Sequence, residues 1–465
     1  MKISKIDVLW NFGATFLRVA TGIILLPLAL RMLSAEDVGL WTVFITVGSF
    51  TLLIDFGFSA AFTRNVIYIF SGAKDLKPKG YELVSDSQII DYSLLKGIMI
   101  VMRRYYLIVA LALLFVMLTA GSFYISSILK SYTGNYNVAI SSWILYILLT
   151  VYQMYTLYYD ALMQGRGLIS RLKQIIIISQ ILEITITAIF LVAGFGIFSM
   201  VVGKFISVLT NRFLCYRSFF DAELTAILKS EIPYSPKKLF KIVSPNAVKI
   251  GITSLGGFLI QRSSFFIGSL YLTLSDVASY GITLQVLNLL AAVSNIYIAT
   301  YLPKITFDRV NNNSQSIKRV YLNGLVAIAA FYIIGAAFLI FLGNPALEII
   351  DSKTFFVARP VMILALVLSI VETNFVMAGN ILHTKNEVPF FKASIVSGIA
   401  IFILMLLSFE FTSLGLYGMV IVPLIVDLAY QGWKWPLEMI REFNINASDF
   451  RDIIQSLLSG KRIKL

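Results

Sequence analysis

Long apolar runs recur along the whole of this 465-residue chain, and they constrain its fold more than any other feature. An α-helix rises about 1.5 Å per residue, so a run of about 20 residues crosses the ~30 Å hydrocarbon core of a bilayer. The sequence contains about twelve such runs, at residues 8–30, 38–62, 105–128, 138–162, 174–195, 197–216, 243–268, 278–301, 321–343, 360–382, 392–409 and 414–433. Their number predicts an all-α polytopic membrane protein with about 12 transmembrane helices.

The composition excludes other broad classes of protein. Apolar residues make up 58% of the chain and charged residues only 14%, whereas soluble domains have about 45–50% and about 25%. The single cysteine, Cys215, excludes an internal disulfide, and the single histidine, His383, provides no histidine cluster. We therefore expect neither a bound metal nor a cofactor.

The distribution of basic residues predicts the topology. If the N-terminus is cytoplasmic, the loops that face outward carry only four of the 38 Lys and Arg residues, namely Arg31, Lys130, Lys353 and Arg359. This bias follows the positive-inside rule and places both termini in the cytoplasm. The net charge of +13 therefore reflects topology, and we do not expect nucleic acid as a partner.

The two halves of the chain resemble each other. Residues 33–41 (Leu-Ser-Ala-Glu-Asp-Val-Gly-Leu-Trp) match 272–280 (Leu-Thr-Leu-Ser-Asp-Val-Ala-Ser-Tyr), and 196–202 (Gly-Ile-Phe-Ser-Met-Val-Val) match 415–421 (Gly-Leu-Tyr-Gly-Met-Val-Ile). The members of each pair are six predicted spans apart, so the halves have the same orientation in the membrane. Parallel repeats of this kind are typical of transporters whose substrate site lies between two lobes.

We therefore expect two six-helix lobes related by an internal repeat. The N-terminal lobe with a basic linker occupies residues 1–236, and the C-terminal lobe occupies 237–436. Residues 437–465 form a cytoplasmic tail whose apolar residues recur at helical spacing before a basic end, as in a helix that lies on an anionic leaflet.

Short motifs along nearly the whole chain carry a family resemblance. These are Val38-Gly39-Leu40-Trp41, Asp55-Phe56-Gly57 with Arg64, Leu162-Met163-Gln164-Gly165-Arg166-Gly167, and the Gly-x-x-x-Met-Val pattern that opens the sixth and twelfth runs. In their order and spacing the chain resembles the polysaccharide-transporter branch, of the O-antigen flippase type, of the multidrug/oligosaccharidyl-lipid/polysaccharide exporter superfamily.

The resemblance implies a function in surface polysaccharide and lipopolysaccharide biosynthesis. Such exporters move a polyprenyl-pyrophosphate-linked oligosaccharide across the bacterial plasma (inner) membrane by alternating access. The implied partners are the lipid-linked oligosaccharide, membrane lipids and glycan polymerase machinery.

Four basic residues lie in the interior of the predicted spans, away from their ends, where charge is expensive and normally faces a cavity or a partner. They are Arg18, Lys204, Lys249 and Arg262. The helical faces of Arg18 and Lys249 carry further polar residues, Asn11, Thr15, Asn246 and Thr253. We expect these cations to bind the lipid pyrophosphate. The alternatives are snorkelling to an interface and pairing with a buried acid.

Acidic residues in the spans offer a second function. Glu183, Glu372 and Asp427 could bind a coupling proton or sodium ion, or could instead neutralise buried cations. We expect a structural role for Asp55, and we expect Asp160, at the end of a span, to be solvated.

Tyrosines cluster in the fourth run. Tyr152, Tyr155 and Tyr159 lie at positions i, i+3 and i+7, where their rings could contact sugars. The alternative is that they anchor the helix at the membrane interface.

Two other functions remain open. A drug or metabolite antiporter of the same superfamily would favour carboxylates over cations in its pocket if its cargo is cationic. A glycan polymerase or ligase would need a large outward loop, which the predicted topology lacks, and the chain contains no nucleotide-binding G-x-x-x-x-G-K-[ST] motif. We therefore expect a transporter and not an enzyme.

Overall fold

The computed structural model describes residue 10 and residues 24–76, 81–83, 90–310, 313–385, 391–446, 448–449 and 451. Almost all of these residues are helical, which confirms the expected fold class. The chain divides into two compact units, Met1–Leu255 and Gly256–Leu465. The boundary predicted from the sequence, at 236/237, falls at the start of helix α12 (Pro236–Tyr271), and this helix runs through the division between the units.

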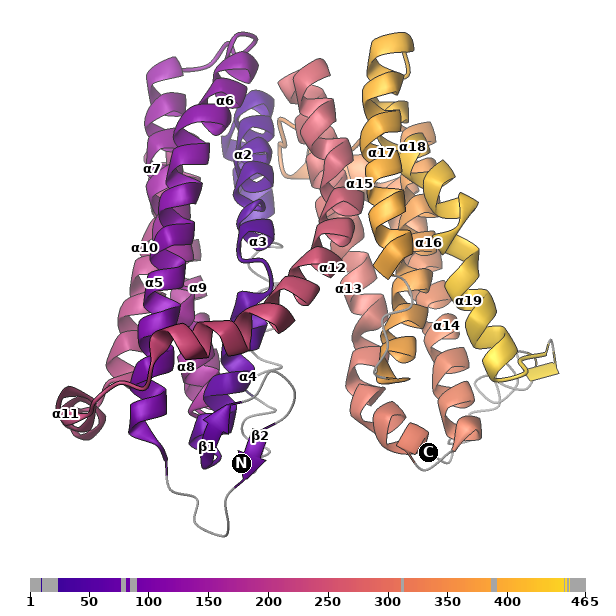
Figure 1. Ribbon diagram of the computed structural model, residues 1–465. Helices are drawn as coiled ribbons and strands as arrows, with labels where there is room; N and C mark the ends of the chain where they lie inside the picture. The colour runs from indigo at the N-terminus through magenta and orange to yellow at the C-terminus, as the bar shows by residue number, and fades with distance from the viewer. Residues whose placement is uncertain are drawn as a thin grey trace. The chain divides into compact units, whose positions relative to one another are not determined.

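The long helices of unit 1 run roughly parallel to one another (Figure 1). The elements of this unit, before α12, are α2 (Ala35–Gly48), α3 (Thr51–Ile54), α4 (Phe58–Phe70), β1 (Ala73–Leu76), β2 (Tyr81–Leu83), α5 (Tyr92–Val116), the π-helical turn η1 (Met117–Gly121), α6 (Ser122–Leu129), α7 (Tyr136–Tyr155), α8 (Tyr158–Gly165), α9 (Ile169–Val192), α10 (Phe198–Phe219) and α11 (Ala222–Ser230). The two strands pair antiparallel, with Ala73 opposite Leu83 and Leu76 opposite Tyr81.

Unit 2 repeats this pattern of long helices. Its elements are α13 (Leu274–Val310), α14 (Ser314–Ala337), the π-helical turn η2 (Phe338–Leu342), α15 (Gly343–Ile349), α16 (Arg359–Leu382), the 3₁₀ turn η3 (His383–Lys385), α17 (Phe391–Phe411), α18 (Leu416–Ala429) and α19 (Gln431–Glu442). Helix α19 packs against α16, so the first residues of the predicted tail belong to this unit. The rest of the tail, from 450 onward, lies outside the described residues apart from Arg451.

Nine helical segments in the described part of the chain are long and apolar enough to cross a membrane. The other three predicted spans have identifiable positions. The run 8–30 lies mostly outside the described residues, the run 38–62 is divided among α2, α3 and α4, and the run 243–268 lies within α12.

The two matched sequence motifs mark equivalent helix starts in the two units. The Ser34 hydroxyl accepts a hydrogen bond of 3.0 Å from the Asp37 amide at the start of α2. At the start of α13, the Thr273 hydroxyl accepts one of 3.1 Å from the Asp276 amide. Both arrangements satisfy amides that a helix N-terminus leaves unpaired.

The second pair of motifs places glycines at turns. Gly196, just before α10, has φ +58°, and Gly415, just before α18, has φ +53°. A side chain would strain this backbone conformation, so glycine is needed at both positions.

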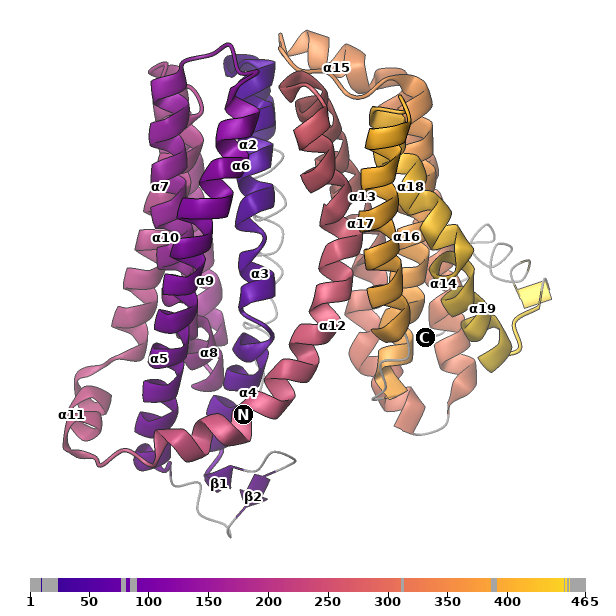
Figure 2. The same ribbon diagram turned by 45° about the horizontal axis from the view of Figure 1, so that its top comes forward.

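A π-helical turn also occurs at the same place in each unit. In unit 1, η1 joins α5 to α6, and in unit 2, η2 joins α14 to α15. Helix α15 turns away from the direction of α14 (Figure 2). Hydrophobic periodicity does not distinguish a single π turn from α-helix, so the sequence did not predict this feature.

Two apolar runs that were predicted as continuous helices are interrupted. The run 38–62 breaks at Asp55-Phe56-Gly57, where Phe56 has φ +49° and Gly57 has φ +75°. The run 138–162 breaks between Tyr155 and Tyr158, where α7 ends and α8 begins. The run 138–162 still forms one candidate span, Tyr136–Gly165, whereas the run 38–62 does not. Apolar content predicts burial in a membrane but not local backbone geometry.

Candidate functional site

Several predicted cavity residues have no side-chain description in the structure. Outside the described residues lie Asn11, Thr15 and Arg18. Asn246, Lys249 and Thr253 belong to helix α12, but their side chains are outside the described part of the structure. Their role in binding an anion remains a prediction.

Arg262 is the predicted cation of α12 whose side chain is described. It is partly buried, and it forms no hydrogen bond or ion pair with other described residues. The hydroxyls of Ser263 and Ser264, which follow it, are buried and have no hydrogen-bond partner in the described part of the chain. Unit 2 therefore presents a short polar segment within an apolar helix, with a guanidinium that no described acid neutralises.

Lys204 has an acidic partner. Its Nζ lies 3.2 Å from Oε1 and 3.3 Å from Oε2 of Glu183. Helices α9 and α10 cross closely here, since a Cβ on Gly203 would overlap the Thr187 hydroxyl oxygen. This close crossing brings Lys204 and Glu183 together. Glu183, predicted as a possible coupling acid, and Lys204, predicted as a cavity cation, therefore neutralise each other.

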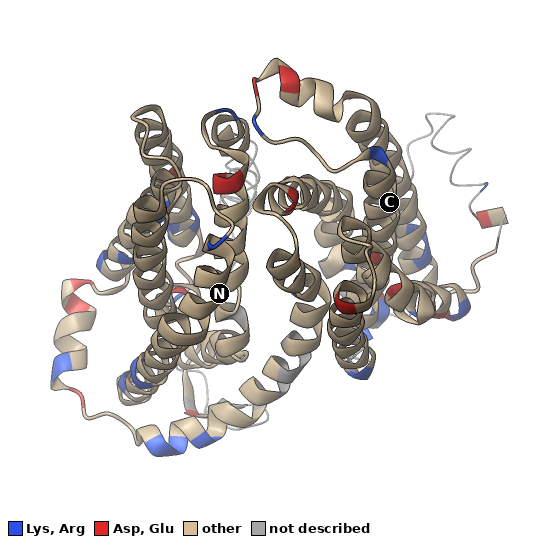
Figure 3. Ribbon diagram, turned by 90° about the horizontal axis from the view of Figure 1, so that it is seen from above, with Lys and Arg blue, Asp and Glu red and all other residues tan. Residues whose placement is uncertain are grey.

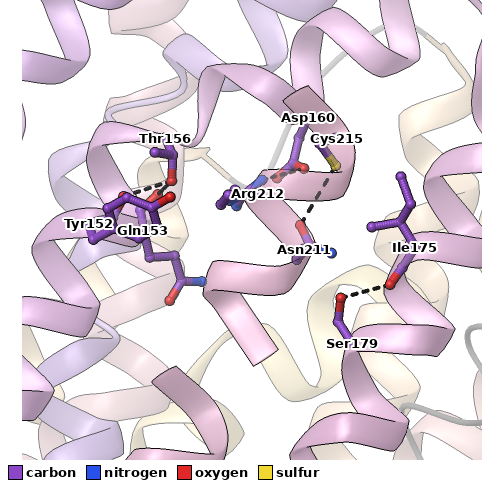
Figure 4. A network of polar contacts seen from close by, with 9 residues as sticks. All are labelled: Tyr152, Gln153, Thr156, Asp160, Ile175, Ser179, Asn211, Arg212 and Cys215. Atoms are coloured by element: carbon purple, nitrogen blue, oxygen red, sulfur yellow. Dashed lines mark hydrogen bonds and ion pairs between the residues drawn. The ribbon is translucent and has the colours of Figure 1, made fainter. Parts of the chain in front are cut away.

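A second ion pair in unit 1 lies at the centre of a polar network (Figure 4). Arg212 on α10 is only 6% exposed, and its Nη1 donates to Oδ1 of Asp160 at 2.7 Å. The Nε of Arg212 has no partner among the described residues. Asp160, expected to be solvated, is partly exposed, with 29% of its side chain accessible, and it is also the counterion of a buried guanidinium.

Arg212 is not among the site residues predicted from the sequence, although it lies within the run 197–216. A basic residue near the end of an apolar run resembles an interfacial residue. The signal that could have identified it is the carboxylate at the end of the run 138–162, because a buried arginine requires a counterion.

The predicted sugar-contact tyrosines do not share one continuous helix. Tyr152 and Tyr155 belong to α7, whereas Tyr159 belongs to α8. All three are half-buried. Tyr158 connects them, because its ring centroid lies 6.2 Å from that of Tyr155 and 4.4 Å from that of Tyr159. Tyr152 lies in the network of Arg212 (Figure 4).

The Asp55 motif has a structural role, as expected. Asp55 Oδ2 accepts a hydrogen bond of 3.2 Å from the Ser59 amide at the start of α4, and Oδ1 accepts one of 2.8 Å from the Tyr106 hydroxyl. The carboxylate thereby provides a hydrogen-bond acceptor for an amide at the start of α4, the helix end that the break at Gly57 creates.

The Arg166 motif joins the end of α8 to the linker. Arg166 Nη1 donates to the Phe219 carbonyl at 2.6 Å, and Nη2 lies 2.5 Å from Asp221 Oδ2. Asp221 also accepts from the Leu224 amide at 2.8 Å as the N-cap of α11. These contacts hold the pKa of Asp221 below its ordinary value, and the hydrogen bond from the Leu224 amide has a larger effect than that from Arg166.

Two carboxylates in unit 2 lack a basic partner in the described part of the chain. Asp427 on α18 is fully buried, and neither of its carboxylate oxygens has a hydrogen-bond partner among the described residues. Glu372 on α16 is close enough to interact electrostatically with Asp427. A buried carboxylate without a cation, with a second, half-buried carboxylate near it, favours the binding of a proton or a metal ion from outside the chain.

Comparison with known proteins identifies the fold but not a sequence family. Neither a protein-family model nor a curated protein sequence matches the chain. The structure of the lipid II flippase MurJ in an inward closed conformation is similar, with a TM-score of 0.64 at 16% identity over 98% of this chain and 91% of that one.

Two multidrug transporters are also similar. An inward-facing MATE transporter of the MOP superfamily has a TM-score of 0.62 at 13% identity, over 93% of this chain and 94% of that one. The MATE multidrug transporter DinF-BH has a TM-score of 0.55 at 12% identity, over 96% of this chain and 97% of that one. The chain thus has the same fold as these solved transporter structures.

Proposed function

We propose that the protein is a flippase that moves a polyprenyl-pyrophosphate-linked oligosaccharide from the inner to the outer leaflet of a bacterial plasma membrane by alternating access. The fold is consistent with this function, since one similar structure is a lipid II flippase. In the proposal both termini are cytoplasmic, and the chain supplies cargo to glycan polymerase machinery.

The observation that carries the proposal is the cation of α12 without an acidic partner. Arg262 remains unneutralised by the described residues, and Lys249 lies on the same helix. A charge-assisted pair with phosphate would stabilise such a guanidinium in the membrane. We assign Arg18, Lys249 and Arg262 to the path of the diphosphate, where Lys249 and Arg262, about 20 Å apart along α12, would contact it at different depths. Lys204 instead pairs with Glu183.

The fold also fits a second function, an ion-coupled antiporter of small molecules. The observation that favours it is the carboxylate pair of Glu372 and Asp427, which could attract a cationic drug as well as a coupling ion. Liposome transport with both classes of cargo separates the two functions.

The test uses purified protein in liposomes that contain a fluorescent polyprenyl-diphosphate oligosaccharide, with an impermeant quencher to report the leaflet. We expect flipping by the native protein. Replacing Arg18, Lys249 or Arg262 with glutamine should reduce the rate about 10- to 100-fold, the effect of losing one charge-assisted hydrogen bond. Lys229→Gln on α11, an exposed position, is the control and should retain the native rate. Transport of a cationic dye without flipping would refute the proposal.

A further inference from the structure

Hydrogen bonds fasten the segment that precedes α12 to the start of α5. The Tyr234 amide donates to the Ser93 carbonyl at 3.0 Å, and the Ser93 hydroxyl donates to the Ile232 carbonyl at 2.7 Å. The Lys96 ammonium donates to the Glu231 carbonyl, also at 2.7 Å. All of these groups belong to unit 1, and together they fix the position at which α12 begins.

One face of the first turns of α12 is buried. Leu239 and Val243 are fully buried, and residues four apart lie on the same face of a helix. The ring of Phe240 stacks on that of Phe58 from α4, with 5.9 Å between the centroids. These turns run across the long helices of unit 1 and not parallel to them (Figures 1 and 2). The packing therefore determines which face of the helix points outward.

The outward face carries three lysines, Lys237, Lys238 and Lys241, all of them exposed (Figure 3). Lys237 and Lys241 are each two residues from a buried position, which places them about 160° round the helix from it. None of the three forms an ion pair with a described residue. Between Glu231 and Asp276 the sequence contains no acidic residue. The first turns of α12 thus present a positive surface that the described residues leave without counterions.

Helix α5 shows where this surface lies relative to the membrane. A Cβ on Gly97 would lie 2.6 Å from the Tyr234 carbonyl oxygen, so α12 begins beside Gly97. The exposed large apolar side chains of α5 begin ten residues later with Leu107 and Ile108, which are 47% and 66% exposed. Ten residues of helix span about 15 Å, and the headgroup layer of one leaflet is about 5–8 Å thick. The lysines therefore lie on the aqueous side of the headgroups, within about one Debye length of the phosphates.

Exposed apolar side chains accompany the lysines. Ile232, just before α12, is 81% exposed, and Phe240 is 42% exposed. Basic residues beside exposed large apolar residues are typical of helices that lie at the surface of an anionic membrane. A soluble acidic partner such as a nucleic acid would neutralise the lysines but would leave the apolar side chains in water. The two features together favour a lipid surface.

We propose that the first turns of α12 bind the headgroups of anionic phospholipids through Lys237, Lys238 and Lys241. Each ammonium donates charge-assisted hydrogen bonds to phosphate oxygens, and each lysine near an anionic surface strengthens binding about fivefold. The bound lipids hold this end of α12, which α5 already positions, at the membrane surface. The proposal does not depend on which cargo the protein transports.

The experiment captures the lipids that neighbour these lysines. Ser235→Cys, at an exposed position just before α12, carries a benzophenone maleimide in a Cys215→Ala background. The full-length protein is reconstituted in liposomes of equal parts phosphatidylglycerol and phosphatidylcholine and is irradiated, and mass spectrometry counts the two lipid adducts. We expect phosphatidylglycerol adducts to exceed phosphatidylcholine adducts at least about fivefold.

Variants of the lysines test the cause of this excess. Replacing all three with glutamine should bring the ratio of adducts to about one, and Lys238→Gln alone should lower it about twofold or more. Replacing all three with arginine keeps the charge and is the matched control, which should keep the ratio within about twofold of native. The same label at Lys130→Cys, an exposed position at the end of α6, controls for a general lipid preference, and its ratio should not respond to the glutamine variants.

A native ratio of about one would overturn the proposal and leave the lysines to a soluble acidic partner. An excess that survives the change of all three lysines to glutamine would also overturn it, because the charges would then not attract the lipid. Should the triple variant fail to reconstitute, Lys238→Gln decides, since an unchanged ratio for that variant contradicts a role for its charge.

Discussion

Acidic side chains in the predicted spans have hydrogen-bond and ion-pair partners in unit 1 but lack basic partners among the described residues of unit 2. In unit 1, Glu183 pairs with Lys204, Asp160 pairs with Arg212, and Asp55 accepts hydrogen bonds from Tyr106 and the start of α4. Removing Asp160 would leave the buried Arg212 guanidinium uncompensated, and breaking a buried pair in this way typically costs about 3–5 kcal/mol. These acids are thus explained by the stability of the unit.

The acids of unit 2 lack such an explanation, and this predicts a role in ion coupling. Glu372→Gln and Asp427→Asn keep the shape of each side chain and remove its ability to bind a proton or sodium ion. We expect each variant to lose the stimulation of liposome transport by an ion gradient while remaining folded. The reason is that a group without an internal counterion changes its occupancy as the external ion concentration changes.

The measurement is the transport rate with and without a pH or sodium gradient. Glu410→Gln, at an exposed position near the end of α17, is the matched control and should respond to the gradient as the native protein does. If both acid variants keep their full response, Glu372 and Asp427 do not couple transport to an ion.

At the scale of helices, the sequence predicted the apolar spans and the internal repeat, and the structure shows what the repeated motifs do. The matched motifs at Ser34 and Thr273 mark equivalent helix caps, and those at Gly196 and Gly415 mark equivalent turns with positive φ. The break at Asp55-Phe56-Gly57 and the π-helical turns were not predicted. An apolar run in the sequence has the same composition whether its helix is continuous or broken. The side chains that form hydrogen bonds at a break are distant in sequence, as Tyr106 is from Asp55.

Close helix crossings give a prediction at this scale. A Cβ on Gly203 would overlap the buried Thr187 hydroxyl oxygen and would lie 3.0 Å from the Glu183 carbonyl oxygen. Gly203→Ala should therefore separate α9 from α10 and destabilise the protein by about 1–3 kcal/mol, the usual effect of overpacking. The thermal unfolding temperature of the purified protein in detergent measures this loss.

Gly257 provides the matched control for this substitution. It also lies within a helix, α12, but no described heavy atom lies within 4 Å of a Cβ placed there. Because alanine favours helix over glycine by about 1 kcal/mol, Gly257→Ala should leave the unfolding temperature unchanged or raise it. Equal unfolding temperatures for Gly203→Ala and the native protein would show that the crossing tolerates a methyl group.

At the scale of the whole molecule, the predicted repeat accounts for the common plan of the two units, but not for their different chemistry. The units share capped helix starts, positive-φ glycines and π turns at equivalent places. Their buried charges differ, because these depend on a few side chains that neither hydrophobicity nor the repeat determines. Arg212 in unit 1 has a counterion, whereas Asp427 in unit 2 has none among the described residues.

The basic linker, visible in α11 and the first turns of α12 (Figure 3), provides the test of topology. The only cysteine, Cys215, is buried, so a Cys215→Ala background allows single labelling sites. Ser230→Cys in the linker and Lys130→Cys at the end of α6 are at exposed positions. If both termini are cytoplasmic, an impermeant maleimide should label Lys130→Cys on intact cells and Ser230→Cys only after permeabilisation, because basic loops remain inside. The reverse pattern would invert the topology, and with it the leaflet from which cargo is taken.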